Sequence, residues 1–373
     1  MVTNKEQNKL NVPHLRFPEF HGEWEKCKLG DIAEFSTARI SSVKLDCKNY
    51  VSTENMLQDF QGVVEAKSVP NETNVISFTC GDILISNIRP YLKKVWKATF
   101  DGGCSSDVFV LQATDTVAKD YLHYAVANDK FINYVMSGAK GVKMPRGDKN
   151  QMRTYQLSLP SIQEQYKIAK LLTLLDERIA TQSKLIEKLE SLIKGLRVRL
   201  IQIENGNIVH LGEIARIYQP QTISSTELTE DGFLVYGANG IIGKYKEYNH
   251  KTEQICITCR GNTCGMVNYT KPLSWITGNA MVINTDEHQN KVCKRYLYHY
   301  LSAYNFNSII SGSGQPQIVR TPLEQLKVPL PTFLEQKQKA TFLDKIQDKI
   351  EISNKTLNLY LQQKQYLLRQ MFI

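Results

Sequence analysis

The sequence predicts an α/β (α+β) protein in which two mixed domains alternate with two long helices that pair as an antiparallel coiled coil. Two observations carry this prediction. The chain of 373 residues repeats itself once. Each copy ends in a long charged segment whose apolar residues follow coiled-coil spacing. The two halves should therefore be similar and related by pseudo-two-fold symmetry.

The repeat consists of three matches in the same order, where a single match would be weak. The matched pairs are Leu-Gly-Asp-Ile-Ala-Glu (29–34) with Leu-Gly-Glu-Ile-Ala-Arg (211–216), Tyr-Leu-His-Tyr (121–124) with Tyr-Leu-Tyr-His (296–299), and Leu-Ser-Leu-Pro (157–160) with Val-Pro-Leu-Pro (328–331). The offset between the copies falls from 182 to 175 to 171 residues. The second copy is therefore shorter, through deletions between the matched segments.

Each copy has the same order of elements, which sets the predicted boundaries. Short β-like runs, such as 82–85 and 254–257, come first, and an Asn/Gly/Pro-punctuated stretch then leads to a Leu-Pro boundary and a long helix. The predicted organisation is an N-terminal arm (1–21), a first mixed domain (22–159), a first helix (160–206), a second mixed domain (207–330) and a second helix (331–373).

Both predicted helices carry a narrow apolar stripe, which is typical of a coiled-coil seam. The alternative is that each helix packs only on its own domain. Shifting Gln182 by 171 positions gives Ser353, so both seams have a polar residue at the same place, and such a residue fixes register. The chain goes out along one helix and returns along the other, so the pair should be antiparallel, with the mixed domains at opposite ends of a rod of about 50 Å. The predicted seam is Ile168, Leu172, Leu175, Ile179, Gln182, Ile186, Leu189, Ile193 and Leu196, with Leu343, Ile346, Ile350, Ser353, Leu357, Tyr360 and Leu367.

Composition excludes several classes of protein. Apolar residues make up 42% and charged residues 22% of the chain, as in ordinary globular proteins. No stretch reaches the roughly 20 apolar residues of a membrane span. The polar start Met1–Lys9 lacks the apolar segment of a secretory signal, so a cytoplasmic location is expected, with the 8 scattered cysteines reduced. The net charge of +9 is spread along the chain, so a nucleic-acid surface must come from local clusters.

Two loops at equivalent places in the copies are candidates for DNA contact. The segment 140–149 carries four cations against one acid, and its glycines and proline suit a loop that contacts phosphates or bases. Its counterpart, 311–320, offers glutamines, a residue type that can read adenine by paired hydrogen bonds, and Arg320, which like Arg146 in the first loop is of a type that can read guanine. The alternative is a pair of solvated loops. Equivalent placement in both copies favours contact.

Three further segments combine cations with aromatic, amide or glycine residues. The segment 87–94 and the pair Arg260 and Asn262 suit phosphate contacts, although surface turns have the same composition. The glycines of 237–243 permit close approach of backbone to a ligand. The full set of predicted DNA-contacting residues is Arg89, Tyr91, Lys93, Lys94, Lys140, Lys143, Arg146, Lys149, Asn239, Lys244, Arg260, Asn262, Gln315, Gln317 and Arg320.

No set of catalytic or metal-binding residues emerges. Cys256 and Cys259 form a Cys-x-x-Cys pair, but they lie in a predicted strand whose alternation places them on opposite faces, which favours buried thiols over a zinc site. The segment 237–245 has the wrong glycine spacing for a phosphate-binding loop, and Tyr245 stands where Ser or Thr is needed. The chain is therefore expected to be non-catalytic. A nucleotide-binding enzyme that uses 237–244 remains an alternative.

The layout resembles the specificity (S) subunit of type I restriction-modification systems across almost the whole chain. The resemblance rests on the opening Pro-His-Leu-Arg-Phe-Pro-Glu-Phe (13–20) with Trp24, on the duplicated Leu-Pro-x-x-x-x-Gln boundary, and on Tyr-Gly-Ala-Asn-Gly-Ile-Ile-Gly (236–243), Arg-Gly-Asn (260–262) and Gly-Gln-Pro-Gln-Ile (314–318). It implies that the mixed domains are target recognition domains, each reading one half of a bipartite site in double-stranded DNA, and that the helices form a spacer.

The same resemblance implies partners and a closed arrangement of the chain. Two methyltransferase (M) subunits would dock on the spacer, and restriction/motor (R) subunits would join them. No cofactor is expected in this chain, whereas S-adenosylmethionine, ATP and Mg would be bound by the partner subunits. The arm 1–21 should meet the end of the second helix. The alternative is a coiled-coil adaptor whose domains do not bind DNA.

Overall fold

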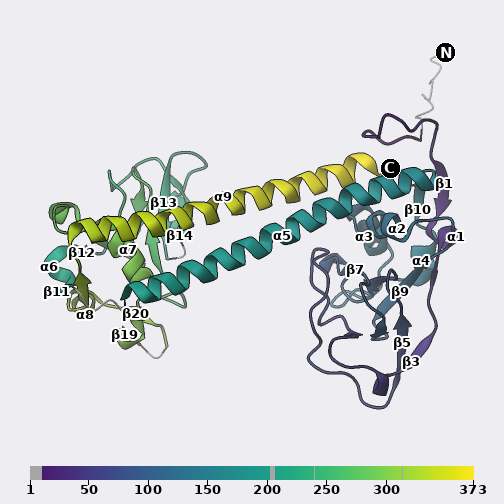
Figure 1. The fold of residues 1–373 in the computed structure, drawn as a ribbon, viewed down its shortest axis with the longest axis horizontal. Coiled ribbons are helices and arrows are strands. Elements are labelled where there is room, and N and C mark those ends of the chain that lie inside the picture. Colours follow the sequence, from purple (N-terminus) through teal and green to yellow (C-terminus); the bar gives the residue numbers. More distant parts are fainter. Residues whose placement is uncertain (1–10, 202–205, 239, 313) are drawn as a thin grey trace. The chain divides into compact units, whose positions relative to one another are not determined.

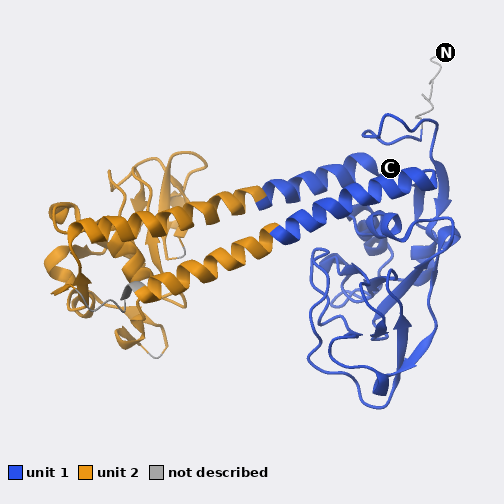
Figure 2. Ribbon diagram, in the orientation of Figure 1, with its two compact units in different colours: residues 1–181, 357–373 blue, residues 182–356 orange. Residues whose placement is uncertain are grey.

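The computed structural model describes residues 11–201, 206–238, 240–312 and 314–373. The chain forms two compact units (Figure 2), which consist of residues 1–181 with 357–373 and of residues 182–356. We refer to them as unit 1 and unit 2. Each unit contains one mixed domain and a part of both long helices, so the helices are shared between the units.

Unit 1 is built on two four-stranded sheets. One has the antiparallel order β2-β9-β6-β7, and the other has the order β3-β5-β8-β4, in which β4 runs parallel to β8. A separate pair, β1 with β10, joins the start of the domain to the start of the long helix. The strands are β1 (Glu25–Lys28), β2 (Ala33–Phe35), β3 (Arg39–Ser41), β4 (Tyr50–Val51), β5 (Asn74–Phe78), β6 (Ile83–Ser86), β7 (Val95–Lys97), β8 (Gly102–Cys104), β9 (Val108–Ala113) and β10 (Gln156–Leu159).

Unit 2 repeats the first sheet and changes the second. The order β12-β18-β15-β16 reproduces β2-β9-β6-β7, whereas the second sheet is β14-β13-β17. The pair β11 with β21 reproduces β1 with β10. The strands are β11 (Asn207–His210), β12 (Arg216–Tyr218), β13 (Phe233–Gly237), β14 (Gly240–Tyr245), β15 (Ile255–Thr258), β16 (Val267–Tyr269), β17 (Trp275–Ile276), β18 (Ala280–Asn284), β19 (Ile310–Ser311), β20 (Gln317–Ile318) and β21 (Lys327–Leu330).

Short helices complete both domains. The helices are α1 (Leu29–Ile32), α2 (Lys119–Val126), α3 (Asp129–Ser137) and α4 (Lys149–Arg153) in unit 1, and α6 (Leu211–Ile214), α7 (Lys294–Ala303) and α8 (Arg320–Glu324) in unit 2. In the second copy α6, α7 and α8 occupy the places that α1, α2 and α4 have in the first. Single 3₁₀ turns are η1 (Ser42–Lys44), η2 (Pro90–Leu92), η3 (Ser225–Glu227), η4 (Asp286–His288) and η5 (Phe306–Ser308).

The repeated Leu-Gly dipeptide has a packing cause. Leu29 and Leu211 begin α1 and α6 and are fully buried. A Cβ on the following glycine would lie 3.2 Å from Arg153 of α4 in unit 1, and 3.1 Å from Glu324 of α8 in unit 2. Glycine therefore lets the two short helices of each copy approach closely.

The two long helices are α5 (Ile162–Ile201) and α9 (Phe333–Met371), shown in Figure 1. Within unit 1, Ile168 and Leu172 near the start of α5 pack in one core with Leu367 and Met371 at the end of α9. The alternative that each helix packs only on its own domain is therefore wrong, because α9 follows the second domain in the chain.

Within unit 2 the opposite ends of the helices meet. Ile193, late in α5, shares a core with Leu343 and Ile350, early in α9. The start of one helix thus packs with the end of the other in both units, which is antiparallel pairing. Gln182 Nε2 donates to the Ser353 carbonyl oxygen (3.0 Å), so the two polar seam residues that the repeat makes equivalent also contact each other.

Every predicted seam residue is buried or half-buried. Where the helices meet the domains, the buried face is wider than the predicted stripe. Ala169 and its counterpart Ala340, which lie outside the stripe, are also buried. The core supplied by the domains makes this possible, since each helix end packs on a domain as well as on the other helix.

The duplicated boundary glutamine ties each long helix to its domain. The Gln165 side chain accepts a hydrogen bond from the Ala118 amide (2.8 Å) and donates one to the Pro160 carbonyl (2.9 Å). Gln336 does the same with the Cys293 amide and the Pro331 carbonyl, both at 2.9 Å. Both side chains are only 1% exposed, so each satisfies backbone groups at the start of α2 or α7 that water cannot reach.

The described part of the N-terminal arm lies at the end of α9, as the resemblance implied. The Leu15 amide donates to the Gln370 carbonyl (3.0 Å). Arg16 forms a hydrogen-bonded ion pair with the buried Glu164 of α5 (2.8 Å). The arm therefore joins the ends of both long helices within unit 1.

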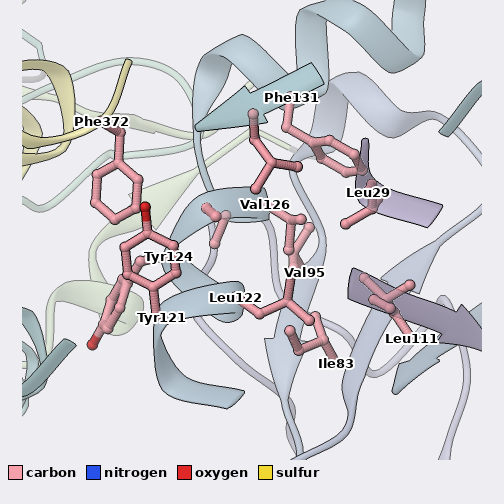
Figure 3. Packing of buried hydrophobic residues seen from close by; sticks show 14 of the residues in the cluster. Leu29, Ile83, Val95, Leu111, Tyr121, Leu122, Tyr124, Val126, Phe131 and Phe372 are labelled. Carbon is pink, nitrogen blue, oxygen red and sulfur yellow. The ribbon is translucent and has the colours of Figure 1, made fainter. Parts of the chain in front are cut away.

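The core of unit 1 lies between the first sheet, the short helices and the two long helices. Figure 3 shows Tyr121 and Tyr124 of α2 beside Phe372, which follows α9. The rings of Tyr121 and Phe372 stack with their centroids 5.2 Å apart. In the part of the chain that the structure describes, no helix is long and apolar enough to span a membrane.

Candidate nucleic-acid interface

Two predicted DNA-contacting segments of the first domain lie against each other. The Arg89 amide, in the turn after β6, donates to the Pro145 carbonyl (2.8 Å), and the Gly147 amide donates to the Asn87 carbonyl (3.0 Å). We refer to residues 87–89 and 140–147 as loop pair 1. The two segments are separate in the sequence, and the ladder of backbone hydrogen bonds makes them one surface.

The second domain has the same arrangement. The Gly261 amide donates to the Pro316 carbonyl (3.0 Å), and the Ile318 amide donates to the Cys259 carbonyl (3.0 Å). We refer to the described residues 259–262, 311–312 and 314–318 as loop pair 2. Pro145 and Pro316 are related by the repeat offset of 171, so equivalent backbone makes equivalent hydrogen bonds in both copies.

The longer loop of each pair also closes on itself in the same way. Lys140 and Arg146 exchange two backbone hydrogen bonds of 3.0 and 2.9 Å. Their counterparts Ser311 and Gln317 pair as part of β19 and β20. Segments predicted as irregular loops thus contain a pair of residues joined by backbone hydrogen bonds.

Loop pair 1 is basic. Its exposed cations are Arg89, Lys140, Lys143 and Arg146. Arg146 lies 3.2 Å from Asp107 and Lys140 lies 3.8 Å from Asp148, and such exposed ion pairs are weak and screened by salt. Among the described residues, no acidic side chain pairs with Arg89 or Lys143. The surface therefore presents cations that are available to phosphates or bases.

Loop pair 2 presents amides where loop pair 1 presents cations. Its exposed polar side chains among the described residues are Arg260, Asn262, Ser311, Gln315 and Gln317. Gln317 occupies the position of Arg146 in the repeat. Arg320, at the start of α8, is held by Glu324 one turn later (2.6 Å). The chemistry of loop pair 2 therefore suits hydrogen bonds to base edges more than charge neutralisation.

Two predicted cations are engaged inside the fold. Lys94 Nζ donates to the Thr53 carbonyl (2.6 Å), and burial lowers the pKa of Lys94. Lys149 Nζ lies 4.8 Å from the centre of the Phe109 ring, and burial lowers its pKa as well. Their predicted contact with DNA stays a prediction, and their intramolecular contacts give each a structural role.

The remaining predicted residues are not members of the loop pairs. Lys93 pairs with Asp129 of α3 (2.8 Å), and Tyr91 is exposed on η2. Lys244 lies on β14, in a different hairpin from loop pair 2. Asn239 lies outside the described residues. For these positions too, DNA contact stays a prediction.

Arg89 has a left-handed backbone, with φ 49° and ψ 63°. Its counterpart is Gly261, with φ 87°, which makes the equivalent hydrogen bond. Glycine adopts this conformation freely, whereas a residue with a Cβ pays about 1–2 kcal/mol. Arg89 also precedes Pro90, and a residue before proline prefers an extended backbone. The two copies therefore need the same backbone, and only the first has a side chain there.

The segment 237–244 is part of a hairpin. β13 ends at Gly237 and β14 begins at Gly240, and the two strands pair antiparallel. A phosphate-binding loop precedes a helix, so this segment does not have the expected structural context. The nucleotide-binding alternative is not supported by the fold.

The cysteines of the second domain lie where strand alternation predicts. Cys256 belongs to one core cluster and Cys259 to another, on opposite faces of the sheet. Burial raises the pKa of Cys256 to about 12. His250 bonds Tyr218 through Nε2 (2.8 Å) and is not beside the thiols in a metal site, since the described residues contain no group of metal-ligand side chains.

Sequence reasoning missed the residues that support loop pair 1. The Asn87 amide donates to the Asp107 carbonyl (2.8 Å), and the Asp107 side chain pairs with Arg146. No motif marks Asp107, which precedes β9. Its contact depends on the pairing of β6 with β9, which only a sheet assignment would have predicted.

Comparison with known proteins agrees with the duplicated layout. Residues 21–191 and 204–361 match the family model described as the type I restriction modification DNA specificity domain. The type I restriction enzyme MjaVIII specificity subunit of Methanocaldococcus jannaschii is 24% identical over 94% of this chain and 92% of its own length. The type I restriction enzyme EcoprrI specificity subunit of Escherichia coli is 33% identical over 36% of this chain and 34% of its own.

The fold is shared with a solved structure. The crystal structure of the type I restriction-modification system S subunit from M. genitalium superposes with a TM-score of 0.70 at 17% identity, covering 97% of this chain and 99% of that one. At this identity the likeness concerns the fold.

Proposed function

The chain belongs to the type I restriction-modification DNA specificity family, and from this premise we propose that it is the DNA sequence-specificity subunit of a type I complex. It reads a bipartite site in double-stranded DNA, one half with each mixed domain. Loop pairs 1 and 2 carry the main contacts. The observation that carries this proposal is that both loop pairs have one backbone frame and different exposed side chains, as two readers of different half-sites require.

The chain contributes recognition, and its partners contribute chemistry. A methyltransferase (M) subunit would bind S-adenosylmethionine, and restriction/motor (R) subunits would bind ATP and Mg. We assign no cofactor to this chain. Its role in catalysis is to deliver the partner subunits to their target.

Two pockets, one in each unit, support docking of two copies of one partner. The pocket in unit 1 has a volume of about 490 Å³ and lies between the α2–α3 junction and α9. The pocket in unit 2 has a volume of about 520 Å³ and is lined by α7, α5 and α9. The α9 residues that line the first pocket occupy the same repeat positions, at the offset of 171, as the α5 residues that line the second: Leu361, Lys364, Gln365, Leu368 and Arg369 correspond to Glu190, Ile193, Lys194, Arg197 and Val198.

The outer faces of the long helices offer exposed apolar side chains. Ile352, Leu359 and Tyr366 of α9 are exposed at intervals of seven residues, as are Leu185 and Leu192 of α5. Seven-residue spacing places such side chains on one stripe of a helix. Helices of the methyltransferase subunits are the proposed occupants.

The spacer role makes a geometric prediction. A helix of 40 residues, the length of α5, spans about 60 Å. Half-sites on one face of B-DNA recur every 34–36 Å or so. Inserting or deleting residues in both helices would therefore change the gap between half-sites that the complex accepts.

The test is to co-express this chain with the methyltransferase subunit of its own restriction-modification system and to map methylated adenines by single-molecule sequencing. A two-part motif with a fixed non-specific gap supports the proposal. A stable complex that methylates without a two-part motif contradicts it. Failure to form any complex would favour the coiled-coil adaptor. The methyltransferase subunit expressed alone is the control.

A further inference from the structure

Arg89 combines an exposed guanidinium with a left-handed backbone. Its amide is fixed by the 2.8 Å hydrogen bond to the Pro145 carbonyl, and its own carbonyl accepts the Leu92 amide (2.9 Å). Hydrogen bonds of both its amide and its carbonyl therefore fix the backbone of Arg89 on loop pair 1.

The comparison with Gly261 shows that the fold does not need a side chain at this position. Both residues are left-handed and make the same hydrogen bond. Glycine meets the backbone requirement without strain, whereas arginine before Pro90 does not. Arginine suits this backbone less well than glycine, so the backbone itself gives no reason for an arginine side chain here.

The charges around Arg89 also favour contact with an anionic ligand. Lys94 lies close enough that Arg89 adds to the lowering of its pKa, after burial. Among the described residues, no carboxylate pairs with the Arg89 guanidinium, whereas Arg146 on the same surface is paired with Asp107. Unbalanced like charges are unfavourable in the free chain and become favourable against an anionic ligand.

On the basis of the proposed function, we propose that Arg89 is a specificity-determining residue of the first domain and reads the O6 and N7 edge of a guanine. A phosphate contact requires only a cation, and Lys140 and Lys143 offer cations without a left-handed backbone. The planar guanidinium on a fixed backbone matches the two acceptors of guanine, which lysine matches less well.

The experiment uses the complex with the methyltransferase subunit and compares wild type, Arg89→Gly and Arg89→Lys by methylation mapping and by binding to target and random duplexes. Both variants should relax the motif at one G·C pair of one half-site and leave the other half-site unchanged. The preference for guanine should fall by about 5- to 150-fold. Arg89→Gly should melt no lower than wild type, because glycine suits this backbone. Arg39→Lys, an exposed arginine of β3, is the matched control.

The outcomes separate this inference from the proposed function. A wild-type complex without a two-part motif would overturn the proposed function, and this inference with it. A wild-type two-part motif that both variants retain would overturn only the role of Arg89. Equal loss of binding to target and random duplexes would make Arg89 a phosphate contact. Loss of guanine preference in Arg89→Gly but not in Arg89→Lys would overturn the requirement for a planar guanidinium, because lysine also reaches the O6 and N7 acceptors.

Discussion

Loop pair 1 and loop pair 2 share their backbone hydrogen bonds but differ in their side chains. The first presents Arg89 and Arg146, and the second presents Gly261 and Gln317 at the same two positions. The backbone frame can be kept while the side chains change, because backbone hydrogen bonds depend little on side-chain identity. Specificity can therefore diverge between the copies while the backbone hydrogen bonds stay the same.

The frame outside the loops behaves differently. Gln165 and Gln336 have the same partners and the same burial in the two copies. A side chain that satisfies buried backbone groups has few substitutes. The following predictions test this division between an invariant frame and divergent loops.

The largest effect is expected from Gln165→Ala or Gln336→Ala. Each change leaves buried backbone groups without partners, which costs about 3 kcal/mol of unfolding free energy, taking roughly 1–3 kcal/mol per group. The two losses should be similar, and each should appear by hydrogen–deuterium exchange in its own unit. Gln163→Ala, on an exposed position of α5, is the control. A large loss from only one substitution would show that the frames are not equivalent.

Gln317→Ala should relax specificity in one half-site. If Gln317 makes a paired hydrogen bond to adenine, discrimination falls by about 1–3 kcal/mol. Competition binding with single-base variants of the target measures this. Equal losses on target and random DNA would remove Gln317 from the base-reading residues.

His123 should make unit 1 sensitive to acid. Burial, followed by the charges of Lys364 and Lys97, lowers the pKa of His123 from 6.5 to about 3. The folded ring stays neutral while the unfolded one takes up a proton, so this stability is present above pH 6.5 and is lost as pH falls toward 3. The loss is about 2 kcal/mol by pH 5, at 1.36 kcal/mol per pH unit.

Urea unfolding at pH 6.5 and pH 5 measures this loss. His123→Gln should remove most of the difference between the two pH values, and His14→Gln, at an exposed position, should not. An unchanged pH dependence in His123→Gln would assign the loss to other groups.

The smallest effect is expected from Lys143→Ala. Removing one exposed cation of loop pair 1 should weaken binding to all sequences alike and reduce the salt slope of log K by about 1. Titrations at several salt concentrations measure the slope. Glycine stands at the equivalent position, 314, so loop pair 2 lacks this cation. A change in the methylated motif would show that Lys143 reads bases.

The repeat, the two long helices and their seam follow from the sequence alone. Periodicity of apolar residues depends on helix geometry, and the seam positions, from Ile168 to Leu367, are all at least half-buried. The placement of Cys256 and Cys259 on opposite faces of the sheet also follows from the sequence, because side chains alternate along a strand. These features are local or periodic, so a single sequence carries them.

Only the tertiary structure decided which separate segments form a surface. The bonds from Arg89 to Pro145 and from Gly261 to Pro316 join residues more than fifty positions apart, and no local pattern records such pairing. Sequence reasoning likewise placed Lys94 and Lys149 among the DNA-contacting cations. A sequence shows that a residue is charged, but it does not show that a backbone carbonyl or an aromatic ring of the same chain contacts that charge. The sequence determined the repeat and the paired long helices, because their apolar residues recur with helical periodicity. The tertiary structure determined the loop pairs, because backbone hydrogen bonds between distant segments form them.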